Sequence, residues 1–87
     1  MENFQIDPKP PKEVIDNVFE QMVQYCQMIS KLLENKDSLS VSQRAELTHN
    51  MQILHMMVIE NYWEDYDIQF AKNCLAEVNG FLTNTIR

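Results

Sequence analysis

Glycine is nearly missing from this chain of 87 residues, in which Gly80 stands alone and the three prolines, Pro8, Pro10 and Pro11, all lie within the first eleven positions. A fold of many strands needs frequent turns, and turns depend largely on glycine and proline. Their scarcity argues against such a fold and favours helices. Hydrophobic residues make up 45% of the chain and charged residues 23%, an ordinary composition for a protein that folds.

Basic residues are also few, with 7 Lys and Arg against 13 Asp and Glu, which gives a net charge of −6. A nucleic-acid-binding protein uses Lys and Arg to neutralise phosphates, and anionic lipid surfaces attract clusters of the same residues. We therefore expect no direct contact with nucleic acid or with a membrane. Neither a spanning apolar stretch nor the pattern of a signal peptide is present, which predicts a soluble, cytoplasmic protein.

Cysteine is sparse as well, since the chain has only Cys26 and Cys74. Their spacing is not that of a metal site, and each lies on an apolar stripe at helical spacing. Such cysteines are usually buried free thiols in a reducing compartment, and we expect that state here.

The first helix is predicted over residues 11–35, after an extended, proline-containing arm at residues 1–10. Pro11 suits the first position of a helix. Apolar residues then recur at spacings of 3 and 4, the pattern of a helical seam: Ile15, Phe19, Met22, Cys26, Ile29 and Leu33. A second ridge indicates that this helix packs against two neighbours: Val14, Val18, Tyr25, Met28 and Leu32.

A second helix is predicted over residues 41–62, because Ser40 followed by Gln43 fits a capping box. Between residues 51 and 59 the segment MQILHMMVI is apolar at seven of nine positions. A helix that is apolar nearly all round must be covered nearly all round. We therefore expect part of this helix to form an interface between copies of the chain, with these candidate residues: Met51, Ile53, Met56, Met57 and Ile59.

A third helix is predicted over residues 66–86, with Asp65 or Asp67 as its cap. Gly80 falls inside it, which favours a close helix crossing or a small kink. The expected fold is all-α: a three-helix bundle built as a long helical hairpin plus a third C-terminal helix. It forms a single domain over residues 11–87, and we expect a homodimer or a higher homo-oligomer.

The segment between the second and third helices combines three aromatic and four acidic residues, with a local charge of −4 over eight residues: Tyr62, Trp63 and Tyr66 with Glu60, Glu64, Asp65 and Asp67. One interpretation is a protein-binding surface, because Trp and Tyr anchor many interfaces and the acids would attract a basic partner. The other is that the rings pack over the end of the core while the acids face water.

Signals for chemistry are weak. Glu46 and His49 are three residues apart on one helix face, as in di-iron helical bundles, but no second such pair exists in the sequence. His55 lies on a different face and suits the core or an interface. Glycine-containing catalytic motifs are absent. We therefore expect neither an enzyme nor a bound metal or cofactor.

The expected function is that of a non-enzymatic protein-binding module, a small adaptor or inhibitor of a larger protein that has a basic surface. Inhibitors and antidotes encoded by phages and mobile elements, which act in the host cytoplasm, offer an analogy. Two alternatives remain open. One is an oligomer that binds small ligands in pockets between subunits, and the other is a structural subunit of a helical assembly.

Overall fold

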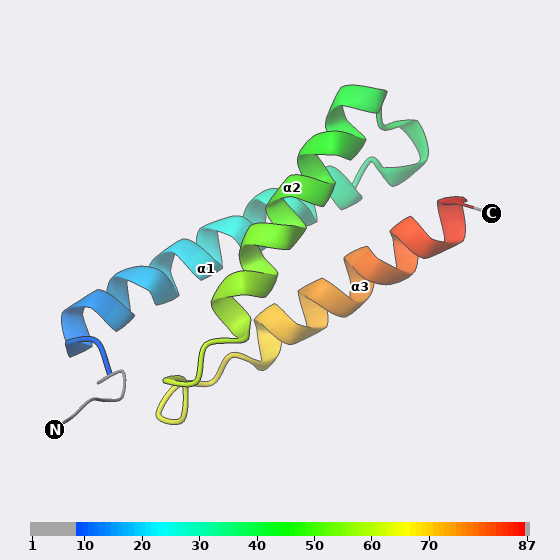
Figure 1. The fold of residues 1–87 in the computed structure, drawn as a ribbon. Helices are drawn as coiled ribbons and strands as arrows, with labels where there is room; N and C mark the ends of the chain where they lie inside the picture. The colour runs from blue at the N-terminus through cyan, green and yellow to red at the C-terminus, as the bar shows by residue number, and fades with distance from the viewer. Residues whose placement is uncertain (1–8, 87) are drawn as a thin grey trace, which may run out of the picture.

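The chain forms three α-helices in the computed structural model, which describes the backbone of residues 9–86 and the side chains of residues 9–83. They are α1 (Lys12–Leu33), α2 (Val41–Val58) and α3 (Gln69–Ile86), and a short 3-10 helix, η1 (Lys36–Ser38), follows α1. The helices run up, down and up, and each contacts the other two (Figure 1). Within residues 9–86 there is no strand, which confirms the predicted all-α fold of three helices.

Helix α1 follows its predicted seam closely. Five of the six seam residues are buried: Ile15, Met22, Cys26, Ile29 and Leu33. The sixth, Phe19, is half-buried and faces the connection between α2 and α3. Pro11 differs slightly from the prediction, because it caps the helix and Lys12 is the first helical residue. The Pro11 carbonyl accepts the backbone N–H groups of Val14 and Ile15.

Helix α2 begins with the predicted capping box. The Ser40 hydroxyl accepts the backbone N–H of Gln43 at 3.1 Å, and the Gln43 side chain accepts the backbone N–H of Ser40 at 2.9 Å. Leu47 and Leu54 are fully buried between α1 and α3. The predicted C-terminal boundary at residue 62 is wrong, because the helix ends at Val58.

The connection at residues 59–68 closes one end of the bundle. The Trp63 indole N–H donates a hydrogen bond of 2.7 Å to the Met57 carbonyl, one of the carbonyls that the end of α2 leaves without a helical partner. This bond and the burial of the indole turn the chain away from the helical path. Helix α3 therefore starts at Gln69 rather than at residue 66, and the Asp67 carboxylate accepts the Gln69 N–H at 3.1 Å.

Helix α3 packs through Ala71, Cys74 and Val78, which are buried. The expectation of a close crossing at Gly80 is wrong. A Cβ added there would meet nothing within 4 Å, so this glycine faces open space on the helix surface.

The predicted arm lies mostly outside the described residues, which begin at Lys9. Lys9 itself is tied to the connection at residues 59–68 by an ion pair of 2.8 Å with Glu64. Among the helices of residues 9–86, none combines the length and apolar character that crossing a bilayer requires.

Candidate functional site

The three aromatic residues of the predicted binding cluster form part of a ring-packed junction at one end of the bundle. We call it the aromatic junction, and it consists of five residues: Phe19, Tyr62, Trp63, Tyr66 and Phe70. Trp63 is only 6% exposed, and its ring meets Tyr66 edge-on at a centroid distance of 5.4 Å. Tyr62 and Tyr66 are half-buried. In this conformation Trp63 belongs to the core and is not presented at the surface.

Two polar links fasten the aromatic junction to the beginning of α1. The Tyr66 hydroxyl donates a hydrogen bond to the Asp16 carboxylate, which also receives the Lys12 ammonium at 2.8 Å. Lys12 and then Tyr66 lower the pKa of Asp16, and the Asp16 carboxylate raises the pKa of the Tyr66 hydroxyl. The Lys9 ammonium likewise lowers the pKa of Glu64. These contacts position the connection against α1.

The four acidic residues of the predicted cluster, Glu60, Glu64, Asp65 and Asp67, are all exposed. The structure thus separates this cluster into rings that pack inward and carboxylates that face water. This arrangement agrees with the second interpretation given above for the aromatic rings. The acids still form a negatively charged surface at one end of the molecule, and their role in binding stays a prediction.

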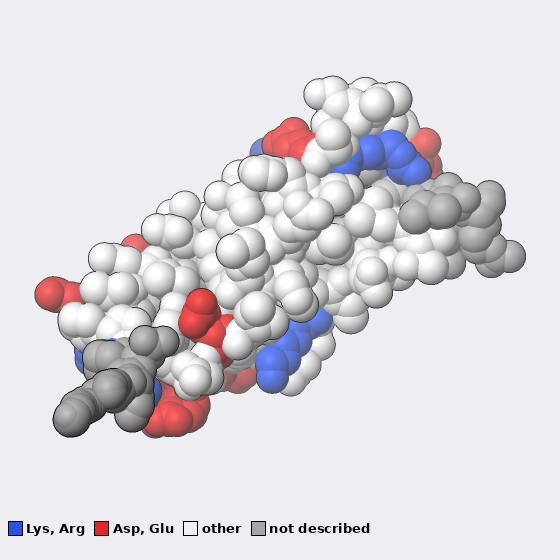
Figure 2. All heavy atoms as spheres, viewed as in Figure 1, with Lys and Arg blue, Asp and Glu red and all other residues white. Residues whose placement is uncertain are grey.

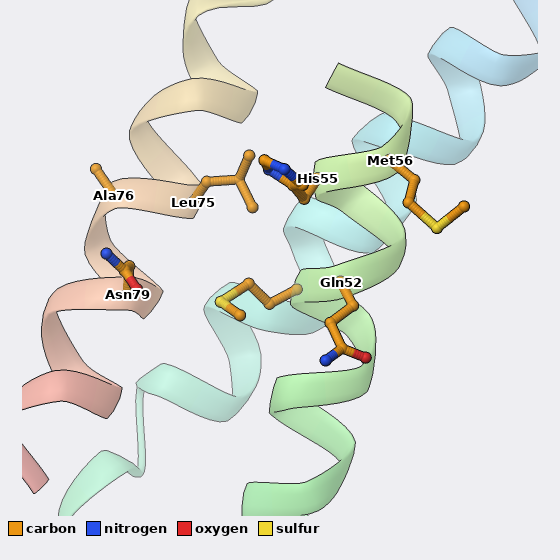
Figure 3. A pocket seen from close by; sticks show the side chains of 7 residues that line it. Gln52, His55, Met56, Leu75, Ala76 and Asn79 are labelled. Carbon is orange, nitrogen blue, oxygen red and sulfur yellow. The ribbon is translucent and has the colours of Figure 1, made fainter. Parts of the chain in front are cut away.

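A hollow lies between α2 and α3. We call it the α2–α3 groove, and its volume is about 710 Å³. Its lining comes from both helices (Figure 3): Met51, Gln52, His55 and Met56 from α2, and Leu75, Ala76 and Asn79 from α3. The His55 ring points across the groove toward Leu75, whereas Met56 projects from the other flank of α2 (Figure 3).

Charge is missing from the α2–α3 groove, because none of its seven lining residues is Lys, Arg, Asp or Glu. Figure 2 shows the same property on a larger scale: the face over α2 and α3 is mostly uncharged, and charged side chains gather toward its ends and edges. Arg44 of α2 places its guanidinium 5.3 Å from the ring centre of Phe81 in α3. An uncharged face is notable on a chain whose net charge is −6.

The residues predicted for an oligomer interface differ in position and in exposure. Met51 and Met56 line the α2–α3 groove, and Met56 and Ile59 are each 64% exposed. Ile53 and Met57 are half-buried. The structure describes one copy of the chain, so the interface itself stays a prediction.

The α3 side of the groove could not be predicted from the sequence. Leu75 has the spacing of 3 and 4 that is typical of the core face of a helix, and nothing in the sequence sets Ala76 or Asn79 apart. The signal available was on α2, where Met51 and His55 are one helical turn apart and share a face. Which residues of α3 lie opposite them depends on how the two helices pack.

Other residues considered for chemistry do not gather into a site. Glu46 and His49 are exposed on α2. Within the part of the chain that the structure describes, no three His, Cys, Asp or Glu residues are close enough to hold a metal ion. Asn50 is 5% exposed, and its side-chain N–H₂ group has no hydrogen-bond partner among the described residues. This polar group sits in the core between Leu47 and Leu54, at the cost of an unmade hydrogen bond.

Comparison with known proteins adds no relative. No protein-family model matches the chain, and neither the curated proteins nor the solved structures contain a match.

Proposed function

We propose that this protein is a non-enzymatic protein-binding module, an adaptor or inhibitor whose α2–α3 groove receives an apolar helix face of a larger protein. The observation that supports this most is the groove itself, an uncharged hollow of about 710 Å³ with methionine, leucine and alanine in its lining. A groove between two helices suits an amphipathic helix. Methionine side chains are flexible and polarisable, so they adapt to the shape of such a partner.

The acidic residues near the groove suggest which end of the partner helix carries basic residues. The acidic residues Glu60, Glu64, Asp65 and Asp67 lie on the connection that joins the end of α2 to the start of α3. This connection lies at one end of α2 and α3 (Figure 1), so the acidic residues stand beyond one end of the groove. A helix with apolar residues on one face and Lys or Arg at one end would match both features. The acids would speed its association and set its direction.

A displayed library of amphipathic helices, each about 18 residues long to match the length of α2 and α3, tests this proposal. The selected peptides should have a Leu, Ile, Phe or Met face and basic residues at one end, and their affinity should fall as salt rises. Ala76→Glu places a charge in the groove at an exposed helical position, and it should weaken binding by about tenfold or more. Gln24→Glu is the matched control, because it adds the same charge on the exposed side of α1.

Two results would refute the proposal. One is a library that yields no binder to the folded wild-type chain. The other is a set of binders that tolerate Ala76→Glu as well as Gln24→Glu, which would place their site elsewhere. Binders that are insensitive to salt would keep the groove but remove the role of the acidic residues.

Self-association through the same face is a second candidate, favoured by the lack of charge there. Two chains of net charge −6 repel each other least where neither presents a carboxylate. Light scattering after size-exclusion chromatography, over a wide concentration range, decides between the two. A dimer that Ala76→Glu converts to a monomer would assign the groove to a second copy of the chain. A wild-type monomer would leave the groove for a different protein.

A further inference from the structure

The packing of α1 against α3 brings together two thiols that are 48 positions apart in the sequence. Cys26 and Cys74 are 9% and 8% exposed, and both belong to the hydrophobic core. Cys74 adds to the raised pKa of the Cys26 thiol, so the two side chains are close enough to interact. The sequence predicts two separate buried thiols, whereas the structure places them as neighbours on two helices that contact each other.

An aromatic contact one to two helical turns away joins the same two helices. Phe19 and Phe70 precede the two cysteines on α1 and α3, and their rings meet edge-on with centroids 5.7 Å apart. Cys26 is two helical turns beyond Phe19, and Cys74 is about one turn beyond Phe70. Each thiol thus lies one or two helical turns beyond an aromatic contact between the same two helices.

We propose that Cys26 and Cys74 form a redox pair, which closes to an intramolecular disulfide that ties α1 to α3 within the native fold. A low-molecular-weight disulfide such as oxidised glutathione serves as the oxidant. One protein thiolate attacks it, forms a mixed disulfide and releases one glutathione thiol. The second protein thiolate then attacks the protein sulfur of that mixed disulfide and releases the other. The protein loses two protons and two electrons, and the oxidant becomes two thiols.

Burial sets the rate of this reaction. Loss of hydration, followed by the neighbouring Cys74, raises the pKa of the Cys26 thiol to about 12, and burial also raises the pKa of Cys74. Thiolate is the reacting species, so the closed bundle reacts slowly. Oxidation therefore proceeds through partial separation of α1 and α3, and low concentrations of urea should speed it.

Once formed, the bond should stabilise the fold. It closes a loop that contains all of α2 and both connections, so it restricts a large part of the unfolded chain. For a domain of this size the expected rise in melting temperature is about 10 °C or more. A bond that strained the native packing would instead lower the melting temperature.

The test is oxidation of the reduced, full-length chain with oxidised glutathione at several urea concentrations below the unfolding midpoint. We expect loss of two hydrogen masses, a peptide that joins Cys26 to Cys74, unchanged helical circular dichroism, and a higher melting temperature that reductant reverses. Cys26→Ala and Cys74→Ala are the controls, and each should acquire a single glutathione adduct at most.

Three results would overturn the proposal. The first is two thiols that stay free at every urea concentration. The second is a wild-type chain that carries two glutathione adducts in place of the internal bond. The third is an internal disulfide that lowers the melting temperature or the helical signal, which would show that the native fold does not accommodate the bond. The outcome does not depend on whether the α2–α3 groove binds a partner.

Discussion

Replacing Trp63 by Ala should destabilise the protein strongly. Trp63 is 6% exposed and packs against Phe19, Tyr62 and Tyr66, with ring centroids 4.9 to 6.2 Å apart. Truncating a buried tryptophan to alanine costs about 3 to 5 kcal/mol. An 87-residue domain has a total stability of roughly 4 to 13 kcal/mol. We therefore expect Trp63→Ala to remove a large part of the free energy of unfolding, about 4 kcal/mol.

Trp63→Phe separates ring packing from the hydrogen bond to α2. Phenylalanine keeps an aromatic ring in the junction but cannot donate to the Met57 carbonyl, which the indole N–H reaches at 2.7 Å. That carbonyl also accepts the backbone N–H of Glu60 at 3.3 Å, so it would not be left without any donor. The cost of losing the bond is therefore at the low end, about 1 kcal/mol, with a further small loss from the smaller ring.

Urea unfolding followed by far-ultraviolet circular dichroism measures both losses. This signal does not depend on tryptophan fluorescence, which vanishes when Trp63 is replaced. Gln24→Ala, at an exposed position of α1, should change stability by less than about 0.5 kcal/mol and serves as the control. A loss below about 1 kcal/mol for Trp63→Ala, with full helical content, would refute the burial argument. It would return the indole to the surface as a binding anchor.

Three further predictions follow from local structure. Gly80→Ala should stabilise the protein by about 1 kcal/mol, because a methyl group there meets open space and alanine favours the helix; a lower melting temperature would contradict this. Ser40→Ala should cost about 1 kcal/mol by removing the N-cap of α2, as measured by urea unfolding; an unchanged midpoint would mean that the capping box contributes nothing. The folded-state pKa of Asp16 lies below its ordinary value of 3.8, so its contribution to stability is complete above that pH and is lost as pH falls through the lowered pKa. Asp16→Asn should therefore flatten the acid side of a plot of urea midpoint against pH, and a plot that matches the wild type would rule out this contribution.

Features that depend on a few neighbouring residues were predicted well from the sequence. The capping box needs only Ser40 and Gln43, three positions apart, and the structure contains both of its hydrogen bonds. The seam of α1 depends on spacings of 3 and 4, which any amphipathic helix in a core must have. Both signals are local, so the three-helix architecture could be derived without knowing how the helices pack.

The connection at residues 59–68 could not be predicted, because the contacts that shape it are distant in sequence. It contains no glycine or proline, and several of its residues are good helix formers. The Tyr66 hydroxyl meets Asp16 across 50 positions, and Lys9 meets Glu64 across 55. These contacts, together with the burial of Trp63, outweigh the local preference of the segment for a longer helix.

The same dependence on distant contacts explains why only part of the predicted binding cluster, at residues 60–67, faces water. Composition shows that rings and carboxylates share a short segment, but it does not show which way each side chain points. In an irregular connection no fixed period relates position to exposure, as it does in a helix. Trp63 therefore lies inside while its neighbours Glu64 and Asp65 are exposed.

Helix α2 carries more apolar surface than its neighbours in the bundle can cover. Its apolar residues are spread around the helix, and the bundle supplies only two neighbours to cover them. The side toward α1 and α3 is covered, as the complete burial of Leu47 and Leu54 shows. The opposite side keeps Met56 and Ile59 at 64% exposure, which costs free energy in water. Because no third element of the described residues covers this side, the apolar excess of α2 supports the proposal that a partner binds there.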